Sequence, residues 1–308
     1  MTATSIASII AITLALTPSV LYATYGEIIG QRAGIVNLGI EGVMLIGAVC
    51  GYAGCVITGN AYLGLLIGAL AGVIFNMLMA FMVVWRGANQ LASGFAIYFL
   101  GGGISMLIGA RYVGSSINGL GKLNFPGLSA LPGGWGAIFS QDLLVWLMVP
   151  MAVVVWWLLF RTRWGLKLRA VGEDKDFAYS AGIHTGRVQT QAMVVAGLLY
   201  GLAGADLILS YTQTWQDWGT SGRGFIAIAI VIFALYSPFR AIVGALLFSA
   251  AVAVWIQLES QGSPVSPFLL QMLPYLVTIF VVLLWGRAKA FSVPAGLKEV
   301  FAGTAKSG

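Results

Sequence analysis

Long apolar stretches without charge alternate with short polar segments along this chain of 308 residues. No Asp, Glu, Lys or Arg occurs in 1–26, 42–85, 87–110 or 260–286. A membrane-spanning helix needs about 20 apolar residues, so the stretch 42–85 is long enough for two. Transmembrane barrels show alternating segments of about ten residues instead, and these stretches do not alternate. The pattern therefore predicts an all-α polytopic membrane protein.

We expect about nine spanning segments in a single transmembrane domain that covers 1–308. The segment 223–236 is too short to span a bilayer with certainty, so it is either a full span, a half-helix or a re-entrant segment buried in protein. The expected spans are 4–24, 34–57, 62–85, 88–110, 142–160, 189–211, 223–236, 239–258 and 268–286.

The positive charges are distributed unequally between the two sides of this arrangement. Of the 16 Lys and Arg residues, all but Arg111, Lys122 and Arg223 fall on one side. Cytoplasmic loops are enriched in Lys and Arg, so the N-terminus is expected outside and the C-terminus inside. The loop 161–188 and the tail 287–308 are then cytoplasmic, and the loop 111–141 is extracytoplasmic.

Composition excludes several other classes of protein. Only 8% of the residues are charged, against about 25% in a soluble domain, so lipid must be the main solvent. The net charge of +6 follows from the cytoplasmic loops and does not call for nucleic acid. Cys50 and Cys55 are five residues apart in one apolar segment, which does not suit a disulfide framework or a metal site.

The sequence holds no recognisable catalytic motif. His184 is the sole histidine, and there is no HExxH or paired-cysteine metal pattern. The string GLGKL at 119–123 lacks the Ser or Thr and the glycine spacing of a phosphate-binding loop. We therefore expect no catalysis, cofactor or metal in this chain. If it takes part in ATP-driven transport, the ATP and Mg²⁺ belong to a partner subunit.

Glycines recur at helical spacing in two of the expected spans. Small residues four apart allow helix backbones to approach closely where lipid gives no hydrophobic drive for association. The recurrence predicts close packing within the chain, with a dimerisation seam as the alternative. The glycines are Gly64, Gly68, Gly72, Gly197, Gly201 and Gly204.

The loop 161–188 contains the signals of a short surface helix. Glu173 or Asp174 can cap its N-terminus, and Gly182 is a suitable stop. We expect about two turns at 174–181 that present Phe177, Ala178 and Ala181. Such a helix can dock into a groove on a partner, and the alternative is a solvated loop that only sets topology.

The loop contains LRAVGED at 168–174 and AGI at 181–183, and VAGLLYGLAG follows at 195–204. In these segments it resembles the coupling loop of bacterial importer permeases of the branched-chain amino acid, ribose and nucleoside class. Three further segments resemble motifs of the nucleoside-type members: QRAGIVNLGIEGVMLIG at 31–47, ANQLASG at 88–94 and GRGFIAIA at 222–229. The motifs keep their order over about 25–286, whereas Asp206 and Arg223 depart from the usual apolar pattern.

The resemblance implies a permease subunit of an ATP-binding-cassette (ABC) importer in the bacterial inner membrane. Its implied partners are a cytoplasmic ATPase, an extracytoplasmic solute-binding protein and a second, paralogous permease in a heterodimer. The implied solute is small and polar, most of all a nucleoside, with a simple sugar, purine base or flavin-like solute as alternatives. An ion-coupled secondary transporter that uses Glu41 and Asp206 is a rival interpretation.

Polar residues within spans are candidates for the solute pathway, because an ionisable group at membrane depth usually faces a cavity or a partner. Asn37 and Glu41 are four residues apart and are expected on one helix face, either along the pathway or as a structural lock. Asn76 is a weaker candidate. Asn89 and Gln90 suit either capping or solute contact.

Three further candidates lie towards the outer side. Asp206 is expected near the outer mouth, either hydrated or paired with Arg223. Trp215 and Trp218 are expected to anchor at the membrane interface, and the alternative is a rim that stacks on a base.

Overall fold

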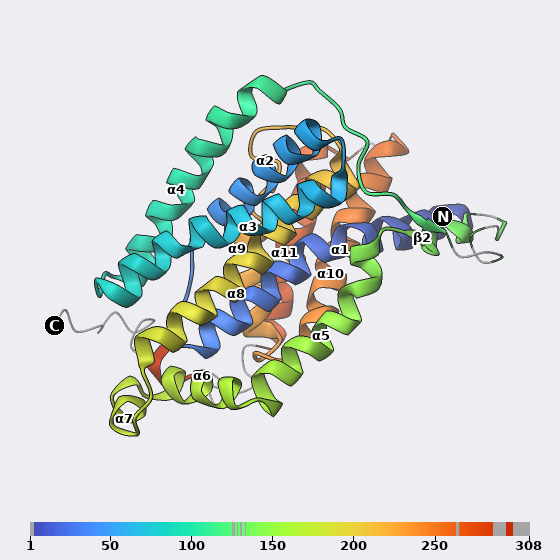
Figure 1. The fold of residues 1–308 in the computed structure, drawn as a ribbon. Helices are drawn as coiled ribbons and strands as arrows, with labels where there is room; N and C mark the ends of the chain where they lie inside the picture. The colour runs from blue at the N-terminus through green and yellow to red at the C-terminus, as the bar shows by residue number, and fades with distance from the viewer. Residues whose placement is uncertain are drawn as a thin grey trace.

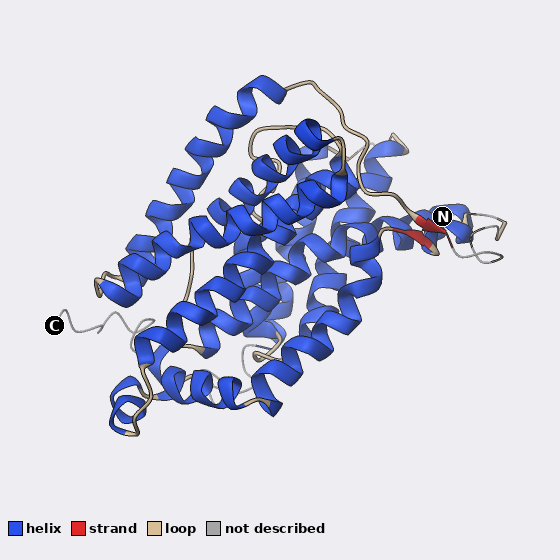
Figure 2. Ribbon diagram, in the orientation of Figure 1, coloured by secondary structure: helices blue, strands red, loops and turns tan. Residues whose placement is uncertain are grey.

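The protein is a bundle of helices that run roughly parallel or antiparallel to one another, with a small strand pair at one end (Figures 1 and 2). The computed structural model describes residues 3–124, 127, 129, 131–132, 134–262, 265–285 and 294–297. The long helices are α1 (Ala3–Arg32), α2 (Ile40–Thr58), α3 (Ala61–Ala80), α4 (Gln90–Gly109), α5 (Leu143–Arg161), α8 (Thr185–Asp206), α10 (Pro238–Ser260) and α11 (Pro267–Trp285).

Short elements complete the fold. Two π-helical turns, η1 and η4, extend α3 and α8, as is common where a helix meets a functional region. The shorter elements are η1 (Phe81–Trp85), η2 (Ala110–Tyr112), β1 (Leu123–Asn124), η3 (Trp135–Ile138), β2 (Ser140–Gln141), α6 (Arg163–Glu173), α7 (Lys175–Ser180), η4 (Leu207–Thr212) and α9 (Arg223–Phe233).

Seven helical segments of the described chain are long and apolar enough to cross a membrane. The expected count of nine is therefore not confirmed, because α9 and the described apolar part of α11 are shorter. Of the three alternatives for 223–236, the full span is not supported, because α9 has 11 residues and a span needs about 20. The first helix was predicted to end at residue 24, which is wrong, because α1 continues to Arg32.

Glycines of α2, α3 and α8 let these three helices pack backbone against backbone. A Cβ on Gly72 would lie 2.5 Å from the carbonyl oxygen of Gly197 and from the Cα of Gly201, and one on Gly68 would lie 2.5 Å from the carbonyl oxygen of Gly47. The predicted close packing within the chain is confirmed, because backbone atoms of neighbouring helices fill the space beside these glycines.

The two ends of the bundle differ. The N-terminal part of α1 lies beside the β1–β2 hairpin, where the Gln141 side-chain amide donates to the carbonyl of Ala11 at 3.3 Å. Helices α6 and α7 lie at the opposite end (Figure 1). The predicted loop 161–188 is thus largely helical, and sequence reasoning missed α6. The Thr162 side chain caps it by accepting from the backbone N–H of Gly165 at 2.9 Å, and Leu168 and Val171 bury its apolar face.

Candidate functional site

The segment between α1 and α2, residues 33–39, is irregular and mostly buried inside the bundle. Buried backbone groups need partners, above all in a membrane protein. Gln189 of α8 donates to the carbonyl of Ala33 at 2.9 Å. Gln90 of α4 donates to the carbonyl of Gly34 at 3.1 Å and accepts from the N–H of Val36 at 2.9 Å. Side chains of two other helices therefore replace the missing helical hydrogen bonds.

Asn37 lies in this irregular segment and not on α2. Its side-chain oxygen accepts from the N–H of Gly39 at 2.8 Å, a local turn that precedes the first helical residue, Ile40. The expectation that Asn37 and Glu41 share a helix face is therefore wrong. The Asn37 amide donates to the side-chain oxygen of Asn76 at 2.8 Å.

Asn76 continues this chain of hydrogen bonds to α8. Its amide nitrogen donates to the carbonyl of Met193 at 2.7 Å, and its side chain is fully buried. Asn37 and Asn76 thus connect the irregular segment, α3 and α8. Because both side chains already have internal partners, this arrangement favours the structural lock over direct solute contact.

Glu27 is a buried acidic residue that sequence reasoning missed. Its carboxylate accepts from the hydroxyl of Tyr200 at 2.6 Å, from the amide of Gln31 at 2.7 Å and from the N–H of Asn37 at 3.3 Å. A usable signal was the four-residue spacing of Glu27 and Gln31, which places both on one face of α1. Because the first span was predicted to end at residue 24, Glu27 was not considered as a residue within a membrane helix.

Glu41, in the first turn of α2, binds the N-terminus of α9. Its carboxylate accepts from the hydroxyl of Thr220 at 2.5 Å and from the N–H groups of Gly222 at 2.7 Å and Gly224 at 2.6 Å. A carboxylate suits this position, because the first N–H groups of a helix lack internal partners and carry partial positive charge. Glu41 therefore serves as a long-range cap.

The N-terminus of α9 lies part-way through the bundle. Eleven residues span roughly 16 Å of helix, about half of a bilayer core of about 30 Å. Beyond the other end of α9, the ring of Tyr236 lies 5.2 Å from the guanidinium carbon of Arg32, which ends α1. Helix α9 thus runs from the interior to the end of the bundle that carries α6 and α7, as a half-helix.

Asp206 is buried, with 1% of its side chain exposed, and does not lie at a hydrated mouth. Neither carboxylate oxygen has a hydrogen-bond partner among the residues that the structure describes. The expected pairing with Arg223 is not formed either, since Arg223 donates to the carbonyls of Gly219 and Thr220. Both expectations for Asp206 are therefore wrong, because this last residue of α8 is packed inside the bundle.

The two tryptophans occupy different environments. Trp215 is 2% exposed and packs against Gly109 of α4 and the ring of Tyr52, so its expected anchoring at the membrane interface is wrong. Trp218 is 36% exposed and lies over Gly102 of α4.

Asn89 caps α4, because its side-chain oxygen accepts from the N–H groups of Leu91 and Ala92. This confirms the capping role predicted for Asn89.

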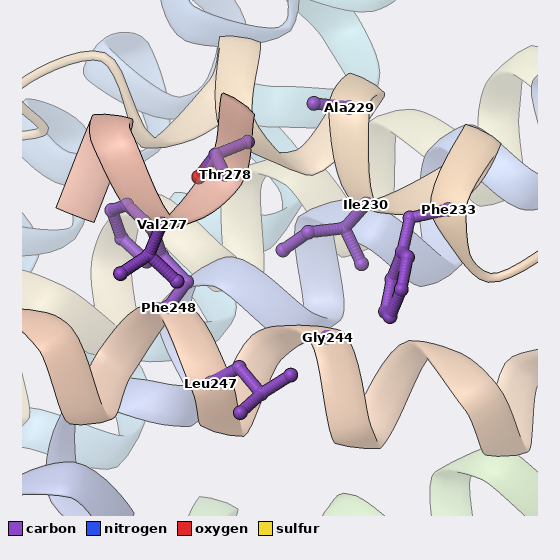
Figure 3. Close-up of a pocket in the computed structure, with 8 residues that line it drawn as sticks. All are labelled: Ala229, Ile230, Phe233, Gly244, Leu247, Phe248, Val277 and Thr278. Carbon is purple, nitrogen blue, oxygen red and sulfur yellow. The ribbon is translucent and has the colours of Figure 1, made fainter. Parts of the chain in front are cut away.

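A hollow between α9, α10 and α11 is apolar and does not suit a polar solute (Figure 3). Its single hydroxyl, that of Thr278, donates to the carbonyl of Pro274 at 2.9 Å within its own helix. The other residues that line it are Ala229, Ile230, Phe233, Gly244, Leu247, Phe248 and Val277.

Helix α7 has the predicted position and boundaries. The Asp174 side chain accepts from the N–H groups of Asp176 and Phe177, both at 2.9 Å, and Gly182 has a φ of +81° at the C-terminal end. The side chains of Phe177 and Tyr179 are 70% and 71% exposed.

Two details of the predicted surface differ. Ala178 is buried and turned towards the bundle, whereas Ala181 is exposed, so Tyr179 takes the exposed place expected for Ala178. Glu173 ends α6 and does not cap α7; its carboxylate accepts from the N–H of Ala295 at 3.0 Å. Apart from 294–297, the tail 287–308 lies outside the described residues.

Residues 8–282 match the family described as the permease component of branched-chain amino acid transport systems. The chain belongs to this permease family. Membership makes it the membrane-spanning subunit of an ABC importer, a multi-pass inner-membrane protein that is not itself an enzyme. The family implies a separate ATPase and a solute-binding protein, and the ion-coupled alternative is not supported.

Three relatives illustrate the substrates assigned within the family. The permease is 37% identical over 80% of its length to a provisionally assigned glucose ABC transporter permease of Haloferax volcanii, of which the match covers 76%. It is 32% identical over 88% of its length to the nucleoside permease NupC of Lactococcus lactis, with 90% of that protein covered. It is 29% identical over 92% of its length to the guanosine permease NupQ of Bacillus subtilis, with 93% covered.

Proposed function

We propose that this permease translocates a nucleoside that an extracytoplasmic binding protein delivers. The observation that carries the proposal is the extent of the match to NupC and NupQ, which runs over 285 and 298 residues. Each match covers at least 90% of the relative's length, so it extends over most of both proteins.

A monosaccharide is the second candidate, because the Haloferax volcanii relative has the higher identity over a shorter match. Both solutes contain a polyhydroxylated ring, so a site for one shares hydrogen-bonding chemistry with a site for the other. A nucleoside adds a planar aromatic base, and the uptake experiment below separates them by that difference.

We further propose that two paralogous permeases form the pathway as a heterodimer, with the N-terminus of this chain outside and its C-terminus in the cytoplasm. ATP and Mg²⁺ bind the partner ATPase. Closure of the ATPase dimer moves α7, and the membrane helices switch access from one side to the other. The ATPase contacts the exposed surface of α7 that is formed by Phe177, Tyr179 and Ala181. The two ends of α7 are fixed by Asp174 and Gly182.

Within the membrane, we assign different roles to the polar candidates. Asn37, Glu41, Asn76 and Gln90 hold the irregular segment and the half-helix in place. Trp218 faces the pathway. The extensive internal hydrogen bonding of the first four residues supports this division, because contact with solute would first require those bonds to break.

The test is uptake of labelled nucleosides by cells that carry this permease with its partner subunits. Ribose, glucose and purine bases are compared in parallel, and ATP and the proton gradient are depleted separately. We expect nucleoside uptake that stops with ATP depletion and survives loss of the gradient. Uptake of glucose without nucleosides would favour the second candidate, and uptake that follows the gradient alone would contradict the ABC mechanism.

A further inference from the structure

The segment 213–222 descends into the bundle from the end that carries the hairpin. It begins at that end, where Thr214 and Trp215 form isolated bridges with Ser116 and Val113. Trp215 packs on Gly109 of α4, and Trp218 packs on Gly102 of the same helix. Seven residues of α-helix correspond to roughly 10 Å, so the chain descends by about that distance between the two tryptophans.

This descending segment has an unusual backbone. Gln213, Trp218 and Ser221 have φ values of +53°, +57° and +49°, in the region that bulky side chains rarely adopt. Such conformations cost free energy and cluster at ligand sites and switch regions. At Trp218, this conformation accompanies a ring whose outer edge packs against Gly102 of α4, while about a third of the residue stays exposed.

The exposed side of this segment is polar. Gln216, Asp217 and Ser221 are exposed, and Arg223 is partly exposed. Irregular backbone at membrane depth is tolerated only where it is buried in protein or lines a water-filled cavity. Exposed polar side chains on such backbone therefore indicate that water or a partner protein, and not lipid, covers this side of the bundle.

Three aromatic rings come together on that side. The ring of Tyr98 on α4 lies 5.4 Å from that of Trp218, tilted by 56°, and 5.2 Å from that of Phe225 on α9, at 68°. All three side chains are at least partly exposed. Rings in this arrangement present apolar faces on which a planar solute can stack.

Two polar side chains bind the backbone of the segment that carries Trp218. One guanidinium nitrogen of Arg223 donates to the carbonyls of Gly219 and Thr220, and its other nitrogens have no hydrogen bond among the described residues. The Tyr275 hydroxyl of α11 donates to the carbonyl of Ser221 at 3.1 Å. The patch thus offers aromatic faces together with hydrogen-bond donors, contributed by α4, α9, α11 and the descending segment.

We infer that Tyr98, Trp218 and Phe225 form an aromatic subsite that stacks on the planar base of the solute during translocation, with Arg223 as a hydrogen-bond donor beside it. The inference rests on the proposed nucleoside function. Tyr98 is on α4, Phe225 is on α9, and Trp218 lies in the segment that leads into α9. The N-terminus of α9 is held by Glu41, so a shift of α9 relative to α4 would open or close the stack. That coupling would let the base be released as the helices switch.

The first test is kinetic, with the assembled transporter in proteoliposomes and adenosine as the solute. We expect Trp218→Ala and Tyr98→Leu to raise the KM for adenosine uptake by about tenfold, while Trp218→Phe retains most of the affinity. Trp157→Ala is the matched control, because Trp157 is an exposed aromatic side chain on α5. Its KM is expected to equal that of the unmodified protein.

The second test is direct photolabelling of the same transporter with 8-azidoadenosine. We expect label on α4 and on 213–225, protected by excess adenosine and lost in Trp218→Ala. If unmodified transporter takes up adenosine but the Trp218 and Tyr98 variants keep its KM and its label maps elsewhere, the subsite is overturned and the proposed function stands. If the unmodified transporter takes up no nucleoside, the proposed function fails first.

Discussion

The carboxylate of Glu41 accepts a hydrogen bond of 2.6 Å from the backbone N–H of Gly224, across 183 positions of the chain. This contact joins the first turn of α2 to the first turn of α9, two helices that both begin inside the bundle. A carboxylate at a helix N-terminus offsets the partial positive charge of N–H groups that lack partners within the helix. The junction between the start of α2 and the start of α9 therefore depends on one acidic side chain.

Replacement of Glu41 by Gln is expected to destabilise the permease by about 1–3 kcal/mol, because the amide retains one acceptor oxygen and loses the charge. The measurement is the thermal midpoint of the purified transporter. Glu259→Gln is the control, since Glu259 is an exposed acid at the end of α10. Equal midpoints for the two variants would contradict the capping role.

Loss of the Tyr200 hydroxyl is expected to weaken the hydrogen bonds by which Glu27 holds the irregular segment 33–39. Tyr200→Phe removes the 2.6 Å donor to Glu27 and leaves a buried carboxylate oxygen without that partner. The expected cost is about 1–3 kcal/mol of stability, measured as a lower thermal midpoint. Tyr62→Phe should change nothing in this measurement, because that side chain is exposed at the start of α3.

A larger side chain at Gly201 is expected to prevent close packing of α2, α3 and α8. A Cβ there would meet the backbone of Gly68 and Gly72. Overpacking of this kind costs about 1–3 kcal/mol or more, so Gly201→Val should reduce the yield of folded protein in size-exclusion profiles. Gly103→Ala is the control, because nothing lies within 4 Å of a Cβ at that position of α4.

Phe177→Asp is expected to leave the permease folded and inserted but to uncouple it from its ATPase. An exposed aromatic anchor at an interface centre commonly contributes about 2 kcal/mol or more, which corresponds to a loss of roughly thirtyfold or more in affinity for the ATPase. The measurement is solute-stimulated ATP hydrolysis by the assembled transporter, with Phe177→Leu as the conservative variant. Normal stimulation in Phe177→Asp would contradict the assignment of α7.

Removal of the charge at Asp206 is expected to maintain or increase stability. Its two oxygens have no hydrogen-bond partner among the described residues, and burial of a carboxylate without partners is costly. Asp206→Asn should therefore raise or preserve the thermal midpoint, in contrast to Glu41→Gln. A clear drop in the midpoint would mean that the Asp206 carboxylate has a stabilising partner in the assembled transporter.

The sequence by itself determined the features that depend on neighbouring residues. Apolar runs without charge specified membrane helices, because burial in lipid depends on local composition. Asp174 and Gly182 specified both ends of α7, because capping acts within one turn of helix. The glycines of α3 and α8 specified close packing, since the absence of a side chain allows it whatever the partner.

Only the tertiary structure decided which polar groups meet. Local spacing placed Asn37 and Glu41 on one helix, but α2 begins between them because Asn76 and the turn at Gly39 engage Asn37. The partners of Glu41 lie 179 to 183 positions away, at a distance that no local period encodes. The burial of Asp206 and of Trp215 likewise follows from how helices pack against one another. Hydrophobicity and capping are local properties of a chain, whereas hydrogen-bond partnership in a bundle is set by contacts between distant segments.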